Sequence, residues 1–162
     1  ELLGTSHLRV FGGELPSGAT EEQGIQWIVE TMKPACNYAA KKGVTLGIED
    51  HGGITAKAAT LLEILRRVDS PFAGINLDIT NFAENYYAQI EACIPYATHT
   101  HIRDVFENHE PVDLDRVFKM FARAGYKGCM SAEYEGYEDA MTGVPKLIVR
   151  DCTLIPLLVK EE

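Results

Sequence analysis

Residues 43–53 read GVTLGIEDHGG, and this stretch decides the predicted fold. It begins on a glycine, continues through apolar residues at alternate positions, and ends on Glu49, Asp50 and His51. A short apolar run bounded by glycines is typical of a strand that a parallel sheet buries on both faces. Such a strand tolerates ionisable side chains only where it emerges into a cleft or onto a metal ion. The stretch therefore predicts a parallel strand with a chemical site at its carboxyl end.

The same pattern, an apolar strand that ends on an ionisable side chain, occurs three more times. The repeats are AGINLDITN at 73–81, ATHTHIRD at 97–104 and GCMSAEYEG at 128–136. They end on Asp78, on His99 or His101, and on Glu133. Each repeat follows the previous one by about 30 residues, the length of one strand–helix unit. The four ionisable ends are therefore expected at the same edge of one parallel sheet.

Apolar residues at helical spacing separate these strands, which predicts five strand–helix units in succession. The expected strands are Ser6–Phe11, a strand within 43–53, Ala73–Ile79, Ala97–Ile102 and Cys129–Tyr134. The expected helices run from Thr20 to Lys42 and over Thr55–Val68, Ala83–Ile94, Asp113–Ala124 and Asp139–Val159. Thr20 and Gln23 have the spacing of a capping box, whereas Pro145 and Pro156 argue against an unbroken last helix.

Alternating strands and helices predict a parallel sheet with right-handed crossovers, and two architectures have that form. An open doubly wound sheet forms its site at one switch point, from one or two strand ends. In an eight-stranded barrel the ends of all strands converge, as four ionisable strand ends require. A full barrel needs about 250 residues. The 162 residues are therefore predicted to form one α/β domain, the last five strand–helix units of a TIM barrel.

The charge of the chain restricts its partners. A net charge of −9 and a pI near 5.0 argue against a nucleic-acid-binding protein, which would present a basic face. No segment has the pattern of a membrane span or a signal peptide, and the four cysteines form no CxxC pair. The chain is therefore expected to act in the cytoplasm on a small molecule, without nucleic-acid or membrane partners. Arg9, inside an apolar strand, is expected to form a buried ion pair.

Five segments in this order resemble the xylose-isomerase-like barrel superfamily, specifically its sugar phosphate isomerase/epimerase group. The segments are LRVFGG at 8–13, GIEDHGG at 47–53, LDITNF at 77–82, HTHIRD at 99–104 and AGYKGCMSAEYEG at 124–136. In that group a glutamate, an aspartate, a histidine and a second glutamate hold a divalent metal ion. The resemblance implies that Glu49, Asp78, His101 and Glu133 are these ligands.

Three carboxylates and one imidazole form an oxygen-rich site that suits Mn²⁺ or Mg²⁺, and also accommodates Co²⁺ or Zn²⁺. Such an ion acts as a Lewis acid on the carbonyl of a sugar. Glu49 and Glu133 are expected to serve as base and acid on the two faces of an enediolate. Reprotonation gives an epimerase or an isomerase, whereas loss of a β-hydroxyl gives a dehydratase. The sequence leaves these three reactions open.

Three further residues are predicted to contact a sugar or polyol substrate. His51 lies on the same side of its strand as Glu49 and suits substrate contact or equally a cap of the loop. Arg103 follows the parity of the expected metal-binding histidine. Arg103 suits a hydroxyl or phosphate of the substrate, or equally a salt bridge to a neighbouring carboxylate. Asn81 stands where epimerases of the group often carry a histidine. Glu107 lies in a loop where they often carry an arginine, so the sequence departs from the ketose 3-epimerase pattern at two positions.

Three alternative functions follow from the same residues. A dehydratase of the inosose or dehydroshikimate type shares the fold and the metal ligands. An abasic-site endonuclease of the superfamily needs more histidine ligands and a basic groove, which five histidines and the charge of −9 fit poorly. The third is a non-catalytic half-barrel that associates with another chain. Because a half-barrel leaves two edge strands and core surface uncovered, a homo-oligomer is expected.

Overall fold

The computed structural model describes residues 2–106 and 108–158, and its centre is a sheet of five parallel strands. They are β1 (His7–Phe11), β2 (Thr45–Glu49), β3 (Ala73–Asp78), β4 (Ala97–Ile102) and β5 (Cys129–Ala132). Each strand pairs with the next one along the chain. A doubly wound sheet would reverse this order at a switch point. The observed order therefore confirms the barrel-type arrangement predicted from the sequence.

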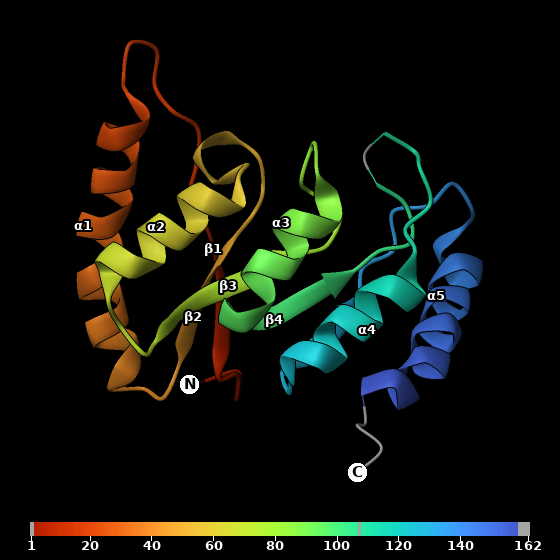
Figure 1. Ribbon diagram of the computed structural model, residues 1–162. Helices are drawn as coiled ribbons and strands as arrows, with labels where there is room; N and C mark the ends of the chain where they lie inside the picture. The colour runs from red at the N-terminus through yellow and green to blue at the C-terminus, as the bar shows by residue number, and fades with distance from the viewer. Residues whose placement is uncertain (1, 107, 159–162) are drawn as a thin grey trace.

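The helices follow one another along the sheet from α1 to α5 (Figure 1). They are α1 (Glu21–Ala40), α2 (Ala58–Val68), α3 (Tyr86–Cys93), α4 (Leu114–Ala124) and α5 (Ala140–Leu154). Thr20 and Gln23 form the predicted capping box, with the Gln23 N–H donating to Thr20 Oγ1 and Gln23 Oε1 accepting from the Thr20 N–H. Within the described part of the chain, no helix combines the length and apolar character that crossing a membrane requires.

The sheet has one apolar face and one polar face. Ile48, Ile75 and Leu77 are fully buried and belong to the core that the helices cover. The alternate positions carry Glu49 and Asp78, which are also buried. Burial of β2 on both faces is thus confirmed, but only its helix-facing side is apolar. Since side chains of a strand alternate between faces, this pattern places the ionisable groups together on the inner side of the sheet.

The inner side of the sheet is strongly curved. The rings of His7 in β1 and His99 in β4 stack with centroids 5.1 Å apart, although β2 and β3 lie between these strands. The contact passes over Gly47 of β2, where an added Cβ would lie 2.4 Å from His7 Nε2. Glycine at this position therefore lets an imidazole of the first strand reach the fourth.

The structure corrects the boundaries of three expected helices. Thr55 lies in a 3₁₀ turn (Gly53–Thr55), and its hydroxyl bonds to the carbonyl of Gly52, so α2 begins later than predicted. Asn85 has the left-handed φ of 50°, so α3 begins after it and not at residue 83. Pro145 lies inside α5 without ending it, and the helix gives way at residue 155 to a 3₁₀ segment that contains Pro156. The predicted end of this helix, Val159, lies outside the described residues.

Candidate metal centre

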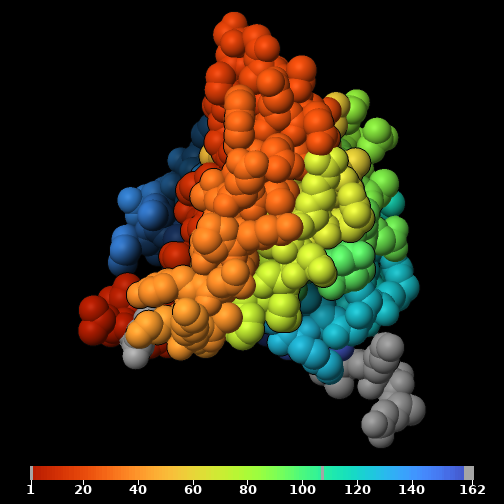
Figure 2. Space-filling model, turned by 90° about the vertical axis from the view of Figure 1, so that its left-hand side faces the viewer, coloured from red at the N-terminus to blue at the C-terminus, as the bar shows by residue number. Residues whose placement is uncertain are grey.

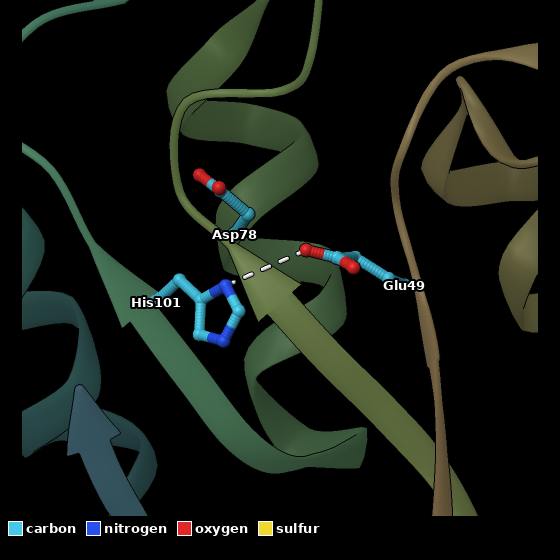
Figure 3. Close-up of side chains that lie close together, drawn as sticks. All are labelled: Glu49, Asp78 and His101. Carbon is cyan, nitrogen blue, oxygen red and sulfur yellow. Dashed lines mark ion pairs between the residues drawn. The ribbon is translucent and has the colours of Figure 1, made fainter. Parts of the chain in front are cut away.

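Three of the predicted ligands meet at the carboxyl ends of adjacent strands. Glu49 is the last residue of β2, Asp78 is the last of β3, and His101 is the penultimate residue of β4. Each offers one ligand atom within 4.8 Å of the other two (Figure 3). The register accounts for this arrangement, because Glu49 pairs with Asn76 and Asp78 pairs with His101. The strand ends are therefore staggered, and their side chains point into one volume.

Two buried atoms of this group make no hydrogen bond. They are Glu49 Oε2 and His101 Nδ1. Arg9 Nη1 lies 3.2 Å from Glu49 Oε2, and Glu133 Oε2 lies 2.9 Å from His101 Nδ1, yet neither contact has hydrogen-bond geometry. Both atoms are therefore available to a ligand at the centre.

Asp78 is oriented by its neighbours. Its Oδ1 accepts hydrogen bonds from the Thr80 N–H at 2.8 Å and the Thr80 hydroxyl at 2.7 Å. Its backbone N–H donates to Asp50 Oδ1 at 2.8 Å, which ties the end of β3 to the end of β2. The remaining oxygen, Oδ2, lies 3.5 Å from Arg103 Nη1. Thr80 therefore holds Oδ1 of Asp78, and Oδ2 takes no part in that turn.

Glu133, the fourth predicted ligand, follows directly after β5. Its N–H donates to the carbonyl of Ile102 at 2.9 Å, which extends the pairing of β4 and β5 by one bond. Its Oε2 contacts His101, but Glu133 is outside the group of described residues whose ligand atoms all lie within 4.8 Å of one another. The side chain therefore borders the centre that Glu49, Asp78 and His101 form.

Arg9 forms its predicted ion pair with a residue of the centre itself. Its Nη1 donates to Glu49 Oε1 at 3.2 Å and lies 4.0 Å from Glu133 Oε1. The prediction of a buried pair is only half right, because Glu49 is buried while the Arg9 side chain is 39% exposed. The exposure follows from the position of Arg9 on β1, which has a partner strand on one side only.

The electrostatic environment raises the pKa values of three ionisable groups at the centre. The Glu49 carboxylate, 3.5 Å from His101 Nδ1, and the charge of Glu133 raise the pKa of His101 against the opposing effect of burial. Burial raises the pKa of Glu133, and the Asp78 and Glu49 carboxylates raise it further, although His101 opposes them. Burial, followed by the charge of Asp78, raises the pKa of Asp50 well above its ordinary value. Three groups with raised pKa values are therefore concentrated at the strand ends, as is common at functional sites.

A cavity of about 570 Å³ opens beyond the strand ends, and the three predicted substrate-binding residues line it. His51 follows β2, Asn81 follows β3 and Arg103 follows β4. Arg103 Nη1 lies 3.4 Å from Asn81 Oδ1, so these two residues contact each other. His99, the alternative to His101, is one layer deeper in the sheet, with Nε2 2.8 Å from Ser131 Oγ. Glu107 lies outside the described residues.

Three residues at the centre were not predicted. Asn76, with Nδ2 3.5 Å from His101 Nε2, lies two positions before Asp78 on the same face of β3, so strand alternation could have identified it. Asp50 accepts a hydrogen bond from the Asp78 N–H. The sequence indicates this residue only as a second carboxylate directly after a buried strand. Glu135, which pairs with Arg103, had no signal, since only the fold brings the two loops together.

Comparisons with known proteins agree with this architecture. The family model described as "Xylose isomerase-like TIM barrel" matches residues 1–151. No protein of curated function matches the sequence. Among solved structures, a D-tagatose 3-epimerase-like protein is 22% identical with a TM-score of 0.79, and the alignment covers 96% of this chain and 64% of that one.

Two further structures have the same fold at comparable identity. The probable 3-DHS dehydratase from Bacillus anthracis is 18% identical, with a TM-score of 0.70 and coverage of 96% of this chain and 64% of that one. The D-allulose 3-epimerase from Methylomonas sp. is 23% identical, with a TM-score of 0.69 and coverage of 93% and 56%. This chain thus spans less than two thirds of the length of these structures. From the family match and the order of its parallel strands, the chain belongs to the xylose isomerase-like TIM barrel family.

Proposed function

We propose that this chain, as one partial barrel domain, carries the metal centre of a sugar or sugar-phosphate isomerase or epimerase. The observation that carries the proposal is the convergence of Glu49, Asp78 and His101 at the carboxyl ends of three adjacent strands. TIM-barrel enzymes have their active sites at this end of the barrel. Proteins named as epimerases are among the structures with this fold, which supports the same reaction class.

The donor atoms suit a hard divalent cation. Two buried carboxylates, one imidazole and the adjacent Glu133 favour Mn²⁺ or Mg²⁺ and also accommodate Co²⁺ or Zn²⁺. The unbonded atoms Glu49 Oε2 and His101 Nδ1 fit this assignment. In the proposal, Glu49, Asp78, His101 and Glu133 hold the ion. When bound, the ion supplies a Lewis acid that makes a C–H next to a substrate carbonyl more acidic.

Glu49 and Glu133 are the proposed proton-transfer groups. They come from β2 and from the end of β5, with β3 and β4 between them, so they approach a ligand from two sides. In the proposal Glu49, which accepts a hydrogen bond from Arg9, is the base that takes a proton from the substrate and leaves an enediolate. The raised pKa of Glu133 suits the acid that returns a proton. Return to the opposite face of the same carbon is epimerisation, and return to the adjacent carbon is isomerisation.

Dehydration of the inosose or dehydroshikimate type is the second candidate. The same residues would form the enediolate, which would then lose a β-hydroxyl before any proton returns. The similarity of the fold to that of a probable 3-DHS dehydratase supports dehydration as the second candidate reaction. Ketoses and inososes incubated separately in D₂O, with products identified by NMR, distinguish the reactions. Epimerisation and isomerisation incorporate deuterium at carbon, whereas dehydration gives an unsaturated carbonyl product.

Metal content per chain tests the proposed centre. Protein incubated with Mn²⁺ and then gel-filtered should retain about one ion per chain by plasma mass spectrometry, as a single centre requires. The Glu133→Gln variant should lose most of it, because one charged ligand becomes a neutral amide. Glu138→Gln is the matched control, since Glu138 pairs with Lys146 and not with the centre. A folded wild-type protein that retains no metal, or a Glu133→Gln variant that retains all of it, would contradict the proposal.

We also propose that copies of this chain associate and that they act in the cytoplasm on a sugar or polyol. The side of α1 and β1 exposes apolar side chains, including Leu8, Phe11 and Tyr38. Figure 2 shows this side of the molecule, with α1 in orange and the N-terminal residues in red. Large exposed apolar patches favour association. The four cysteines are free thiols, which suits a reducing compartment.

A further inference from the structure

The cavity beyond the metal centre has an unusual charge balance. Of the described residues that line it, Arg103 is the one with a permanent positive charge. Two acidic residues, Asp104 and Glu135, line the same cavity. The lining beyond the metal centre therefore carries no excess of positive charge. Whether an anionic group can bind there depends on whether the Arg103 guanidinium is free or already paired.

Arg103 is already engaged on both sides of its guanidinium group. Its Nη2 donates a charge-assisted hydrogen bond to Glu135 Oε2. Its Nη1 lies 3.5 Å from Asp78 Oδ2 and 3.4 Å from Asn81 Oδ1. The Arg103 side chain is 14% exposed, whereas that of Glu135 is 59% exposed. Glu135 is therefore the solvent-exposed partner of this ion pair, and Arg103 is the shielded one.

The other charged residue of the lining does not change this balance. Asp104 Oδ2 lies 3.8 Å from Arg150 Nη1, so its partner is a cation of α5 outside the lining. An arginine binds phosphate or carboxylate best when its forked N–H groups are free to face the oxygens. Here an anionic ligand would have to displace Glu135 and leave that carboxylate without its partner.

The rest of the lining fits an uncharged polyhydroxylated chain. His51, Asn81 and His109 offer hydrogen-bonding groups, and the Tyr137 hydroxyl lies 3.0 Å from His109 Nδ1. The exposed ring of Tyr137 adds an aromatic surface. A lining that has both polar groups and apolar carbon surface matches a polyol, which presents hydroxyls and C–H groups along one chain.

From these contacts we infer that the part of the substrate beyond the metal is an uncharged polyol, not a phosphorylated or carboxylated group, and that Glu135 is the specificity-determining residue. The inference rests on the proposed function and deepens it. Glu135 acts by occupying Arg103, so a neutral glutamine at this position should free the guanidinium for an anion. The selectivity of the cavity then depends on one ion pair between the loops after β4 and β5.

Calorimetric titration with D-tagatose and D-tagatose 6-phosphate tests the inference. Both ligands are titrated into the wild type before and after Mn²⁺ loading, at one fixed pH. The free ketose should bind the wild type about tenfold more tightly than its phosphate. Glu135→Gln should strengthen binding of the phosphate about tenfold and change that of the free ketose less than about twofold. Glu138→Gln removes the same charge from the same loop but leaves Arg103 paired, so it should change neither.

Three results would overturn the inference. They are tighter binding of the phosphate than of the free ketose by the wild type, equal effects of the two variants, or no binding of either ligand in either form. Equal effects would mean that the general charge of the loop matters and not the Arg103 pair. Loss of the proposed function is recognised separately, since it appears as a lack of metal uptake whatever the ligand preference. The metal-free titrations report the preference of the cavity without a contribution from Mn²⁺.

Discussion

Asp50 illustrates how much of the centre depends on residues that are not ligands. Its buried carboxyl accepts the N–H of Asp78 and holds the ends of β2 and β3 at a fixed distance. Its second oxygen, Oδ2, is buried without a hydrogen bond. Burial and then the charge of Asp78 raise the pKa of Asp50, so this carboxyl keeps its proton more readily than an exposed aspartate does. Asp50 is therefore a positioning residue for the end of β3.

The pH dependence of metal binding is predicted from His101. Its pKa is raised by Glu49 and Glu133, so in the metal-free protein it keeps a proton to a higher pH than a free imidazole. Because a metal ion must displace that proton, Mn²⁺ affinity should fall as pH decreases, by about tenfold per pH unit below the His101 pKa. The decline should begin above about pH 6.5, the ordinary histidine value.

Isothermal titration of Mn²⁺ between about pH 5.5 and 8.5 measures this dependence. His101→Gln should remove both the slope and most of the affinity. His109→Gln changes an exposed imidazole outside the centre and should leave the slope intact. An affinity that is independent of pH would show that His101 does not bind the ion.

At the scale of elements, β2 both fills the core and positions a candidate ligand, as its sequence suggests. Its apolar positions fill the core, while Gly47 and Glu49 face the inner side of the sheet. Sequence reasoning identified the strand and its functional end, because alternation and flanking glycines are local signals. It could not identify why Gly47 is a glycine, because His7 and His99 meet over it only after four strands have paired.

Gly47→Ala is predicted to destabilise the sheet. The new Cβ would lie 2.4 Å from His7 Nε2 and 3.0 Å from the backbone nitrogen of Asn76. Overpacking of this kind costs about 1–3 kcal/mol in free energy of unfolding. Urea denaturation measures the loss, and adding His7→Ala to Gly47→Ala should recover most of it. A Gly47→Ala variant as stable as the wild type would mean that the stacked histidines do not set the spacing there.

At the scale of the molecule, the sheet that the described residues form is open, with five strands in the order β1 to β5. β1 and β5 are the terminal strands of the order, and each has a hydrogen-bonded partner on one side only. A groove beside β1 is lined largely by apolar side chains from residues 2–10, α1 and β2. Exposed strand edges and apolar surface both promote association.

Association of copies of this chain is the prediction at this scale. Light scattering should give a mass above the 17.9 kDa of one chain. Leu8→Lys should lower that mass, because Leu8 is 53% exposed on β1 and a charge there opposes burial in an interface. A stable species of 17.9 kDa that binds no apolar dye would contradict the prediction.

The sequence by itself determined the five strands, their parallel arrangement and the four ionisable strand ends, since periodicity, glycines and helix caps are encoded over a few neighbouring residues. Tertiary structure decided what those residues do to one another. Three contacts join residues that are 32–84 positions apart in the sequence. They are the pairing of Arg9 with Glu49, the place of Glu133 beside the other ligands, and the ion pair of Arg103 with Glu135. Such contacts depend on the curvature and stagger of the sheet, which arise only when all strands have paired.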